Sequence, residues 1–240
     1  MFLVDVEREF LLTLLPSSGE VAEIGTAKGD FAEQILARNK PRRLHLVDPW
    51  EHQADPSYSA DPNNISQADF DRRYQDVVTR FTAPAATGQV VLHRAYSPAA
   101  AEHFADESLD WIYIDGMHTE AAVLADLIAF APKVKPHGLI LGHDYTTHQA
   151  FRAMGFGVVE AVNRFVTQAG YTFLALTYEG SPSYAIARNP ASPAVRHFMS
   201  GILTRIQTVV EIEGIERREM TQKDVMGPDG KPFRTVIGFR

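Results

Sequence analysis

The strongest constraint on the fold is a regular alternation between short apolar runs and longer amphipathic segments. The runs that predict strands are EVAEIGT (20–26), RRLHLVD (42–48), GQVVLHRA (88–95), LDWIYIDG (109–116) and GLILGHDY (138–145). Helical patterns follow these runs at 28–38, 67–81, 97–105, 119–131 and 156–168. Continuous apolar strands that alternate with helices predict a parallel sheet covered on both faces, and right-handed crossovers then give a doubly wound α/β fold.

The chain outside this alternation predicts three further features. YTFLALTY (171–178) and SYAIAR (183–188) are joined by EGSP, which predicts a hairpin that adds an antiparallel strand to one edge of the sheet. The pattern of residues 1–19 predicts a short amphipathic helix. We expect this helix to belong to a single domain that covers residues 1–190. Residues 191–240 predict a helix, a strand and a PDG turn between extended segments. We expect this C-terminal extension to pack on the same domain, to form a homodimer contact or to cover the substrate.

The composition excludes several classes of partner. The 240 residues carry a net charge of −7, whereas nucleic-acid backbones and anionic membranes select basic surfaces. There is no cysteine, and hence no disulfide, no thiolate metal ligand and no cysteine nucleophile. Charged residues interrupt the apolar start, and no stretch has the ~18 uncharged apolar residues of a membrane helix. We therefore expect a cytoplasmic protein with neither a nucleic-acid nor a membrane partner.

A glycine-containing loop follows the first of the predicted parallel strands. EIGTAKGDF places Gly25 at the turn and Gly29 where the following helix begins, which allows a sharp turn and a close approach of a ligand to the helix. Asp48 ends the next strand, where a carboxylate can accept both hydroxyls of a ribose. The spacing G-x-x-x-G lacks the central glycine of a dinucleotide fingerprint, so it favours an adenosine ligand without a diphosphate. The alternative is an ordinary turn with a chance acid nearby.

Carboxylates and imidazoles gather after the fourth and fifth strands of the alternation. Asp115 and His118 follow one strand, and His143 and Asp144 follow the other. Neighbouring parallel strands lie ~5 Å apart, so these side chains can share one divalent cation or one proton path. Carboxylate and imidazole ligands suit Mg²⁺, Mn²⁺, Fe²⁺ or Zn²⁺, and a neutral imidazole can accept a proton.

Each member of this group also has a structural interpretation. Asp115 could serve as a helix N-cap, His118 as a polar residue at the rim, and His143 with Asp144 as turn formers. Asp126, on the helix after the fourth strand, is expected either to brace that helix against the site or to be solvated. The remaining histidines show no comparable clustering in the sequence, and we expect them to be structural or exposed.

The segments VAEIGTAKGDFAEQIL, LHLVDPW, WIYIDGMH and GLILGHDY together resemble the class I S-adenosylmethionine-dependent methyltransferases. More narrowly, the IDG-x-H and HDY signatures resemble the macrocin O-methyltransferase type. The resemblance runs in order from about residue 20 to 188. It implies a mostly parallel, seven-stranded Rossmann-like sheet with an antiparallel last strand, with S-adenosylmethionine as the cofactor.

The resemblance also implies roles for individual residues. The cofactor-binding positions are Glu23, Gly25, Thr26, Gly29, Asp48, Trp50, Ala95, Tyr96, Ser97 and Asp115. Metal-dependent relatives bind Mg²⁺ at the positions of Asp115, His143 and Asp144, although here that last pair begins with histidine. His118 stands where related O-methyltransferases carry a basic catalytic residue, and Asp115 would act beside it.

These observations predict a methyltransferase that methylates a hydroxyl of a small molecule, such as a sugar or a secondary metabolite, with a divalent cation and a histidine base. The polar loop 51–66 is placed to cover the cofactor. Within the same fold, the alternative is metal-independent methylation at nitrogen or carbon. Outside it, the alternatives are a nicotinamide-dependent oxidoreductase and a cofactor-binding module without catalysis.

Overall fold

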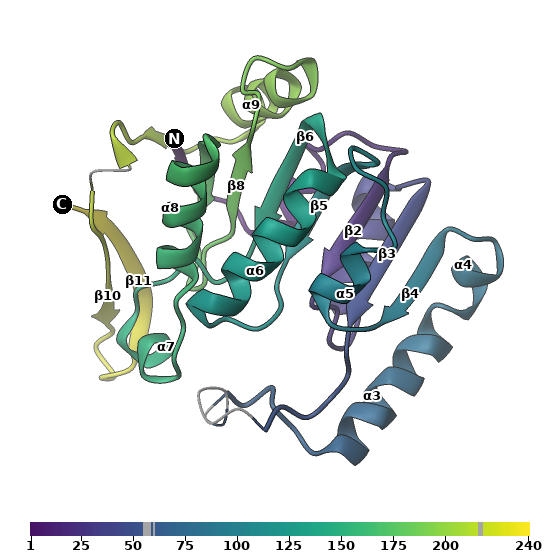
Figure 1. Ribbon diagram of the computed structural model, residues 1–240. Coiled ribbons are helices and arrows are strands. Elements are labelled where there is room, and N and C mark those ends of the chain that lie inside the picture. The colour runs from purple at the N-terminus through teal and green to yellow at the C-terminus, as the bar shows by residue number, and fades with distance from the viewer. Residues whose placement is uncertain (55–58, 60, 216–217) are drawn as a thin grey trace.

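The expected parallel strands form one side of the sheet in the computed structural model, from the edge strand β4 to β6 (Figure 1). They stand in the order β4-β3-β2-β5-β6, and each pair of neighbours within this order is parallel. Their bounds are β2 (Glu20–Ile24), β3 (Arg43–Asp48), β4 (Val90–Arg94), β5 (Leu109–Ile114) and β6 (Val134–Gly142). The structure describes residues 1–54, 59, 61–215 and 218–240. The predicted doubly wound α/β fold is confirmed.

The predicted hairpin is present, but it does not lie at the edge of the sheet. β8 (Tyr184–Ala187) is inserted between β6 and β7 (Thr172–Thr177) and is antiparallel to both. All four of its residues are buried, as expected of a strand that is covered on both faces and paired on both sides. The expectation of an edge position was therefore wrong, because a short apolar strand with no polar face is stable only inside the sheet.

Both ends of the chain extend the sheet from seven strands to nine. β1 (Phe2–Val4) pairs in parallel with β7, and β9 (Val209–Glu211) pairs antiparallel with β1. The amphipathic helix expected over 1–19 is confined to α1 (Arg8–Leu11), so this prediction was wrong for the first residues. Residues 2–4 instead form β1, and their backbone pairs with that of β7, which would otherwise be an unpaired edge.

Helices cover the two faces of the sheet and enclose two apolar cores. α5, α6 and α8 lie together on one face, as Figure 1 shows, whereas α1, α2, α3 and α9 contribute to the core on the other. The bounds are α2 (Asp30–Gln34), followed by a π-helical turn (Ile35–Asn39), α3 (Gln67–Arg80), α4 (Thr82–Ala86), α5 (Ser97–Ala101), α6 (Glu120–Phe130), followed by a 3₁₀ turn (Ala131–Lys133), α7 (Gln149–Ala153), α8 (Val158–Ala169) and α9 (Pro193–Arg205).

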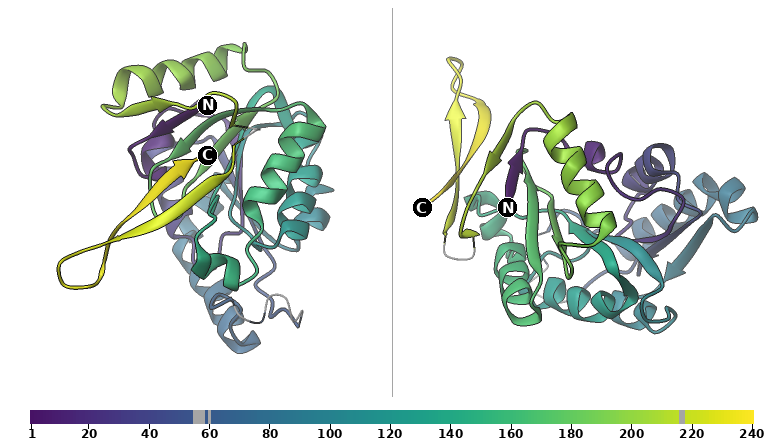
Figure 2. Two further views of the ribbon diagram at one scale, coloured as in Figure 1. Left: turned by 90° about the vertical axis from the view of Figure 1, so that its left-hand side faces the viewer. Right: turned by 90° about the horizontal axis from the view of Figure 1, so that it is seen from above.

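The C-terminal extension divides into two parts. α9 buries Val195, Phe198 and Ile202 in the core, so it packs on the same domain, and β9 joins the sheet. β10 (Met220–Met226) and β11 (Pro232–Phe239) pair only with each other among the described strands and project from the body, as Figure 2 shows. No helix in the described part of the chain is long and apolar enough to cross a membrane.

Candidate functional site

A cavity of about 730 Å³ opens at the carboxyl ends of the central parallel strands. It spans the gap between β2 and β5, where the strand order reverses and where ligands bind in open α/β sheets. Eleven of the residues expected at the site line it, namely Glu23, Gly25, Thr26, Asp48, Ala95, Tyr96, Ser97, Asp115, His118, His143 and Asp144. Gly29 and Trp50 do not line it.

The two loop glycines are required for different reasons. Gly25 has a φ of 93°, and a Cβ at this position would lie 2.0 Å from the carbonyl oxygen of Asp115. This glycine therefore allows the ends of β2 and β5 to approach each other closely. Gly29 has a φ of 79°, and its Cβ would lie 2.7 Å from the ring of Phe81. Gly29 thus serves the packing of the loop against the helices behind it, rather than opening space for a ligand.

Asp48 holds the glycine loop with both of its carboxylate oxygens. Oδ2 accepts a hydrogen bond from the backbone N–H of Ala27 at 2.8 Å, and Oδ1 accepts one from that of Trp50 at 2.7 Å. Burial raises the pKa of Asp48, while the two N–H groups oppose this shift. Trp50 is fully buried and donates its indole N–H to the carbonyl of Ala27 at 2.8 Å. It braces the loop from behind, so it does not flank a ligand in the cavity.

Asp126 lies in the cavity and joins α5 to α6. Only 5% of the residue is exposed, and one carboxylate oxygen accepts a short hydrogen bond from the hydroxyl of Ser97. Burial raises the pKa of Asp126 to about 7. The bracing role is therefore supported, and the solvated alternative was wrong.

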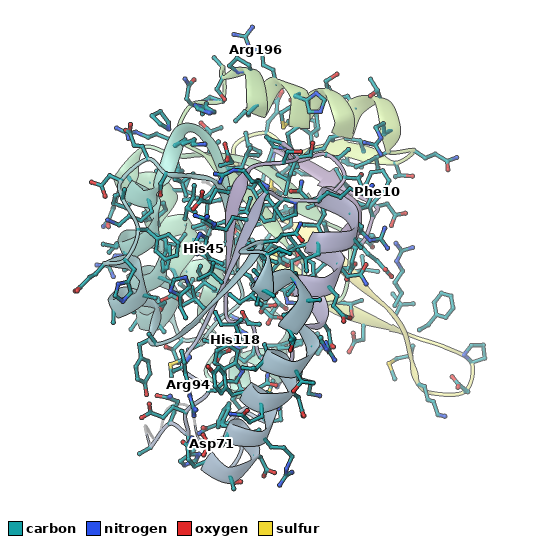
Figure 3. The ribbon with its side chains drawn as sticks, turned by 90° about the vertical axis from the view of Figure 1, so that its right-hand side faces the viewer. Phe10, His45, Asp71, Arg94, His118 and Arg196 are labelled. Atoms are coloured by element: carbon teal, nitrogen blue, oxygen red, sulfur yellow. The ribbon has the colours of Figure 1, made fainter. Side chains whose placement is uncertain are left out.

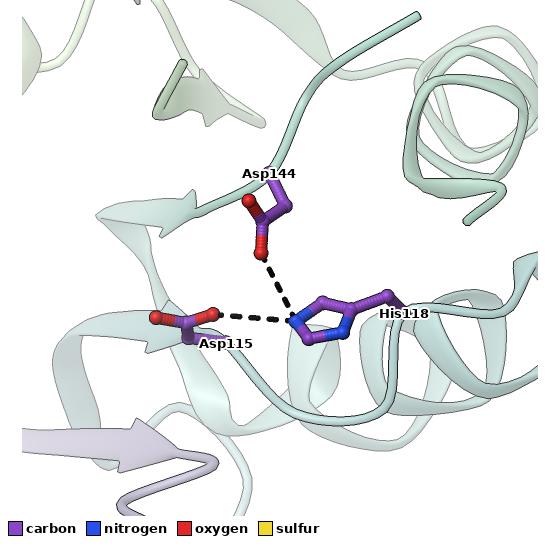
Figure 4. A group of neighbouring side chains, drawn as sticks. All are labelled: Asp115, His118 and Asp144. Atoms are coloured by element: carbon purple, nitrogen blue, oxygen red, sulfur yellow. Dashed lines mark ion pairs between the residues drawn. The ribbon is translucent and has the colours of Figure 1, made fainter. Parts of the chain in front are cut away.

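The acids and imidazoles expected after β5 and β6 do converge; Figure 4 shows Asp115, His118 and Asp144, and His143 lies beside them. His118 Nε2 lies 3.1 Å from Asp144 Oδ2 and 3.6 Å from Asp115 Oδ1. His143 Nδ1 lies 3.4 Å from Asp144 Oδ1 and 3.7 Å from Asp115 Oδ1. Asp144 has a φ of 54°, a left-handed conformation that aspartate tolerates better than most residues. Asp115, His118 and Asp144 offer ligand atoms within 4.8 Å of one another, a grouping that could hold a metal ion.

The electrostatics of this group follow from burial and mutual contact. Burial lowers the pKa of His118, but the carboxylates of Asp115, Asp144 and Asp61 raise it well above its usual value. Burial raises the pKa of Asp115, but the neighbouring imidazoles of His143 and His118 outweigh it and hold this pKa below its usual value. The arrangement places positive charge between the two carboxylates of Figure 4, which is where a divalent cation would fit.

The structural alternatives for two of these residues were wrong. The helix after β5 is capped by the side chain of Thr119, which accepts a hydrogen bond from the backbone N–H of Ala122. Asp115 is therefore not the cap. Only 8% of His118 is exposed, so it does not lie on the rim.

Two charged residues of the site were missed in the sequence. Asp61 is 3% exposed and accepts a hydrogen bond from His118 Nδ1 at 3.2 Å. Arg8 donates to Asp115 Oδ2 at 2.9 Å, and its guanidinium lies 4.5 Å from the centre of the Phe31 ring. Neither follows the end of a strand that the sequence predicts, so only the tertiary fold shows that they reach the cavity. Residues 55–58 and 60 of the expected covering loop 51–66 lie outside the described residues.

Two of the histidines away from the site cluster in the fold, although the sequence shows no such clustering, and they fit the expected structural role. His45 on β3 and His93 on β4 lie side by side, with 2.9 Å between Nδ1 and Nε2. Glu20 Oε1 lies 3.1 Å from His45 Nε2. Figure 3 shows His45 well separated from His118, and the ion pair of Arg94 and Asp71 on the other side of His118. Alternation along single strands does not show which positions on two strands face each other.

Comparison with known proteins agrees with this geometry. A family model described as a methyltransferase domain matches residues 22–145, more than half of the chain. The chain therefore belongs to this methyltransferase domain family. It is an S-adenosylmethionine-dependent methyltransferase of the class I type. No curated protein matches the sequence significantly.

Several solved structures share the fold at low sequence identity. A candidate caffeoyl-CoA O-methyltransferase from Staphylococcus aureus is 17% identical, with a TM-score of 0.51, over 76% of this chain and 84% of that one. A candidate rRNA methylase from Clostridium thermocellum is 12% identical, with a TM-score of 0.51, over 75% and 94%. A spermidine synthase is 14% identical, with a TM-score of 0.50, over 83% and 64%. These likenesses show the fold alone, because the names cover different reactions.

Proposed function

We propose that this methyltransferase methylates a hydroxyl group of a small molecule, such as a sugar or a secondary metabolite. The observation that carries the proposal is the pair of carboxylates, Asp115 and Asp144, which meet two imidazoles in the same cavity as the ribose-binding candidate Asp48. The narrower resemblance to the macrocin O-methyltransferase type is part of this proposal.

The cofactor is proposed to lie across the strand ends from β2 to β4. The carboxylate of Asp48 would accept hydrogen bonds from the ribose, since each of its oxygens retains a lone pair beyond the backbone contacts. Glu23, Gly25 and Thr26 would line the methionine part. An unpartnered, buried Glu23 Oε2 supports this placement, as it has no hydrogen-bond partner among the described residues.

The adenine part is proposed to lie between the end of β4 and α6. Ala95, Tyr96 and Ser97 line this end of the cavity together with Asp126. A carboxyl group with a pKa of about 7 can accept or donate a hydrogen bond near neutral pH, which suits the edge of an adenine ring.

S-adenosylmethionine, when bound, supplies a methyl group already activated on a sulfonium, so the chain itself must align the acceptor oxygen in line at ~3–3.5 Å. A divalent cation held by the acid group would polarise the acceptor hydroxyl and favour its ionisation. An imidazole of His118 or His143 would accept the hydroxyl proton, because both side chains line the cavity beside the carboxylates.

The test begins with calorimetric titration of chelator-treated protein with S-adenosylhomocysteine and, separately, with NAD. Binding of the first ligand alone is expected. Transfer of a labelled methyl group is then measured on panels of hydroxylated and aminated acceptors, with and without added Mg²⁺ or Mn²⁺. Methylation at oxygen that chelation abolishes would support the proposal. Methylation at nitrogen or carbon that ignores chelation would replace it with the metal-independent alternative.

We also propose a cytoplasmic homodimer with neither nucleic-acid nor membrane partners. The net charge of −7 and the lack of cysteine support the location and the exclusions. The tip of the C-terminal hairpin supports the dimer, because it exposes large apolar side chains, among them Met226 (56% exposed) and Phe233 (80% exposed).

A further inference from the structure

We propose that His118 is a metal ligand through Nε2, that Asp61 positions it, and that the site selects a transition-metal ion such as Mn²⁺, Fe²⁺ or Zn²⁺ over Mg²⁺ and Ca²⁺. The role of the ion in catalysis rests on the proposed function, whereas the binding of the ion by these residues does not. It changes the expected ligand set from Asp115, His143 and Asp144 to Asp115, His118 and Asp144.

The first argument is the distance between ligand atoms. His118 Nε2 lies 3.1 Å from one oxygen of Asp144 and 3.6 Å from Asp115 Oδ1. Metal–ligand bonds of ~2.0–2.2 Å place neighbouring ligand atoms ~3–3.6 Å apart in octahedral or tetrahedral geometry. The other oxygen of Asp115 is held by Arg8 at 2.9 Å, which fixes the carboxylate with Oδ1 toward the imidazole.

The second argument is that Asp61 and Phe156 hold the imidazole, while its Nε2 makes no hydrogen bond to any residue that the structure describes. His118 Nδ1 donates to Asp61 Oδ2 at 3.2 Å, and the ring stacks on Phe156 at 4.2 Å between centroids. Asp61 is itself fixed, since its Oδ1 accepts the backbone N–H of Asn63 at 2.8 Å. Nε2 is buried and has no hydrogen-bond partner among the described residues, although it faces two carboxylates. An inner imidazole oriented by an outer carboxylate is the usual arrangement of a metal-bound histidine.

The third argument concerns His143, the histidine expected to be the ligand. Its Nδ1 lies 3.7 Å from Asp115 Oδ1 and 3.4 Å from Asp144 Oδ1, which is not the oxygen of Asp144 that faces His118. His143 is not a member of the group of ligand atoms formed by Asp115, His118 and Asp144. No carboxylate among the described residues holds its other edge. The two imidazoles therefore have different roles: His118 binds the metal ion, and His143 lies beside the reacting hydroxyl.

The choice of ion follows from the donor set. Mg²⁺ and Ca²⁺ prefer oxygen ligands throughout, whereas an imidazole nitrogen beside two carboxylates suits Mn²⁺, Fe²⁺, Co²⁺ and Zn²⁺. An amide or carboxylate in place of His118 would provide the all-oxygen set. The identity of this one side chain therefore determines the preference.

The test measures metal binding by the full, chelator-treated chain without any acceptor. Calorimetry with Mn²⁺ and with Mg²⁺ is expected to give at least a hundredfold tighter binding of Mn²⁺. Pulsed EPR of bound Mn²⁺ is expected to show coupling to an imidazole nitrogen. His118→Asn should abolish that coupling and narrow the Mn²⁺ preference at least tenfold, whereas the matched control His143→Asn should leave both unchanged. Asp61→Asn should weaken Mn²⁺ binding ten- to a hundredfold and retain the nitrogen coupling.

Loss of the coupling in His143→Asn but not in His118→Asn would overturn the assignment, and so would equal affinity for Mg²⁺ and Mn²⁺ or no metal binding at all. Titration with S-adenosylhomocysteine is run on the same samples. Retained binding of that ligand shows that each variant is folded, and it separates failure of the metal assignment from failure of the proposed cofactor site.

Discussion

Asp48 offers the sharpest test of how this cavity binds its cofactor. Its two oxygens each accept one backbone N–H, from Ala27 and Trp50, at 2.8 and 2.7 Å. Each oxygen retains capacity for one ribose hydroxyl. Asp48→Asn converts one oxygen to an amide NH₂, which faces a backbone donor and can accept from neither the loop nor the ribose. Asp48→Ala removes both acceptors.

The expected magnitudes follow from these contacts. A hydrogen bond to a charged group contributes ~1.5–3 kcal/mol. Asp48→Asn should therefore weaken binding of S-adenosylhomocysteine by about 10- to 150-fold, and Asp48→Ala by well over 100-fold. Calorimetry gives the affinity, and chemical unfolding gives the accompanying loss of stability. Trp50→Phe is the matched control, because it loses one hydrogen bond behind the same loop without altering the cavity lining.

The control should lose about 1 kcal/mol of stability and change the affinity less than threefold. Binding by Asp48→Ala within threefold of the wild type would refute the ribose assignment. Equal losses of affinity in Asp48→Ala and Trp50→Phe would show instead that loop order, rather than direct contact, determines binding.

Three further outcomes are expected. Gly25→Ala should destabilise the protein by more than ~3 kcal/mol and abolish cofactor binding, because the added Cβ would clash with the carbonyl oxygen of Asp115. Gly170→Ala is the control, since Gly170 also has a positive φ but has open space around it, and it should lower the free energy of unfolding by only ~1–2 kcal/mol. Burial, reinforced by the neighbouring histidines, lowers the pKa of His93 to about 4, so the folded state binds this proton less readily than the unfolded state. The stability that this group contributes is complete above its usual pKa near 6.5 and is lost as the pH falls toward 4. After allowance for solvent screening, the free energy of unfolding measured with urea should fall by about 1 kcal/mol more between pH 7 and 5 in the wild type than in His93→Gln. Equal decreases in the two proteins would contradict this explanation. Phe233→Ser should convert a dimer to a monomer in light scattering, and a wild-type monomer would exclude the hairpin contact.

Much of the fold could be predicted because its signals are local. Apolar runs marked the five parallel strands from β4 to β6, and EGSP marked the β7–β8 hairpin. The position of β8 inside the sheet could not be predicted from its hairpin, because a turn specifies only the nearest partner. β1 was missed for a similar reason: three apolar residues become a strand only when the free edge of β7 is beside them.

The candidate site shows the same division. Asp48, Asp115 and Asp144 could be found because each stands at the carboxyl end of an apolar strand or within two residues of it, where a parallel sheet collects its polar residues. Asp61 comes from a polar loop and Arg8 from the N-terminal segment, and neither position carries a periodic signal. Trp50 was assigned to the wrong side of its loop, since the sequence does not show which way a buried indole turns.

The pairing of β1 with β7 has a consequence for the site at the far end of the sheet. Only three residues separate the end of this strand from Arg8, the cation that fixes Asp115. The reach of that guanidinium therefore depends on which residues of β1 and β7 are opposite each other. A slip of one residue would move Arg8 by about 3.3 Å along the sheet and turn the strand's side chains to the opposite face. The pairing register of one peripheral strand thus determines where a positive charge lies in the candidate site.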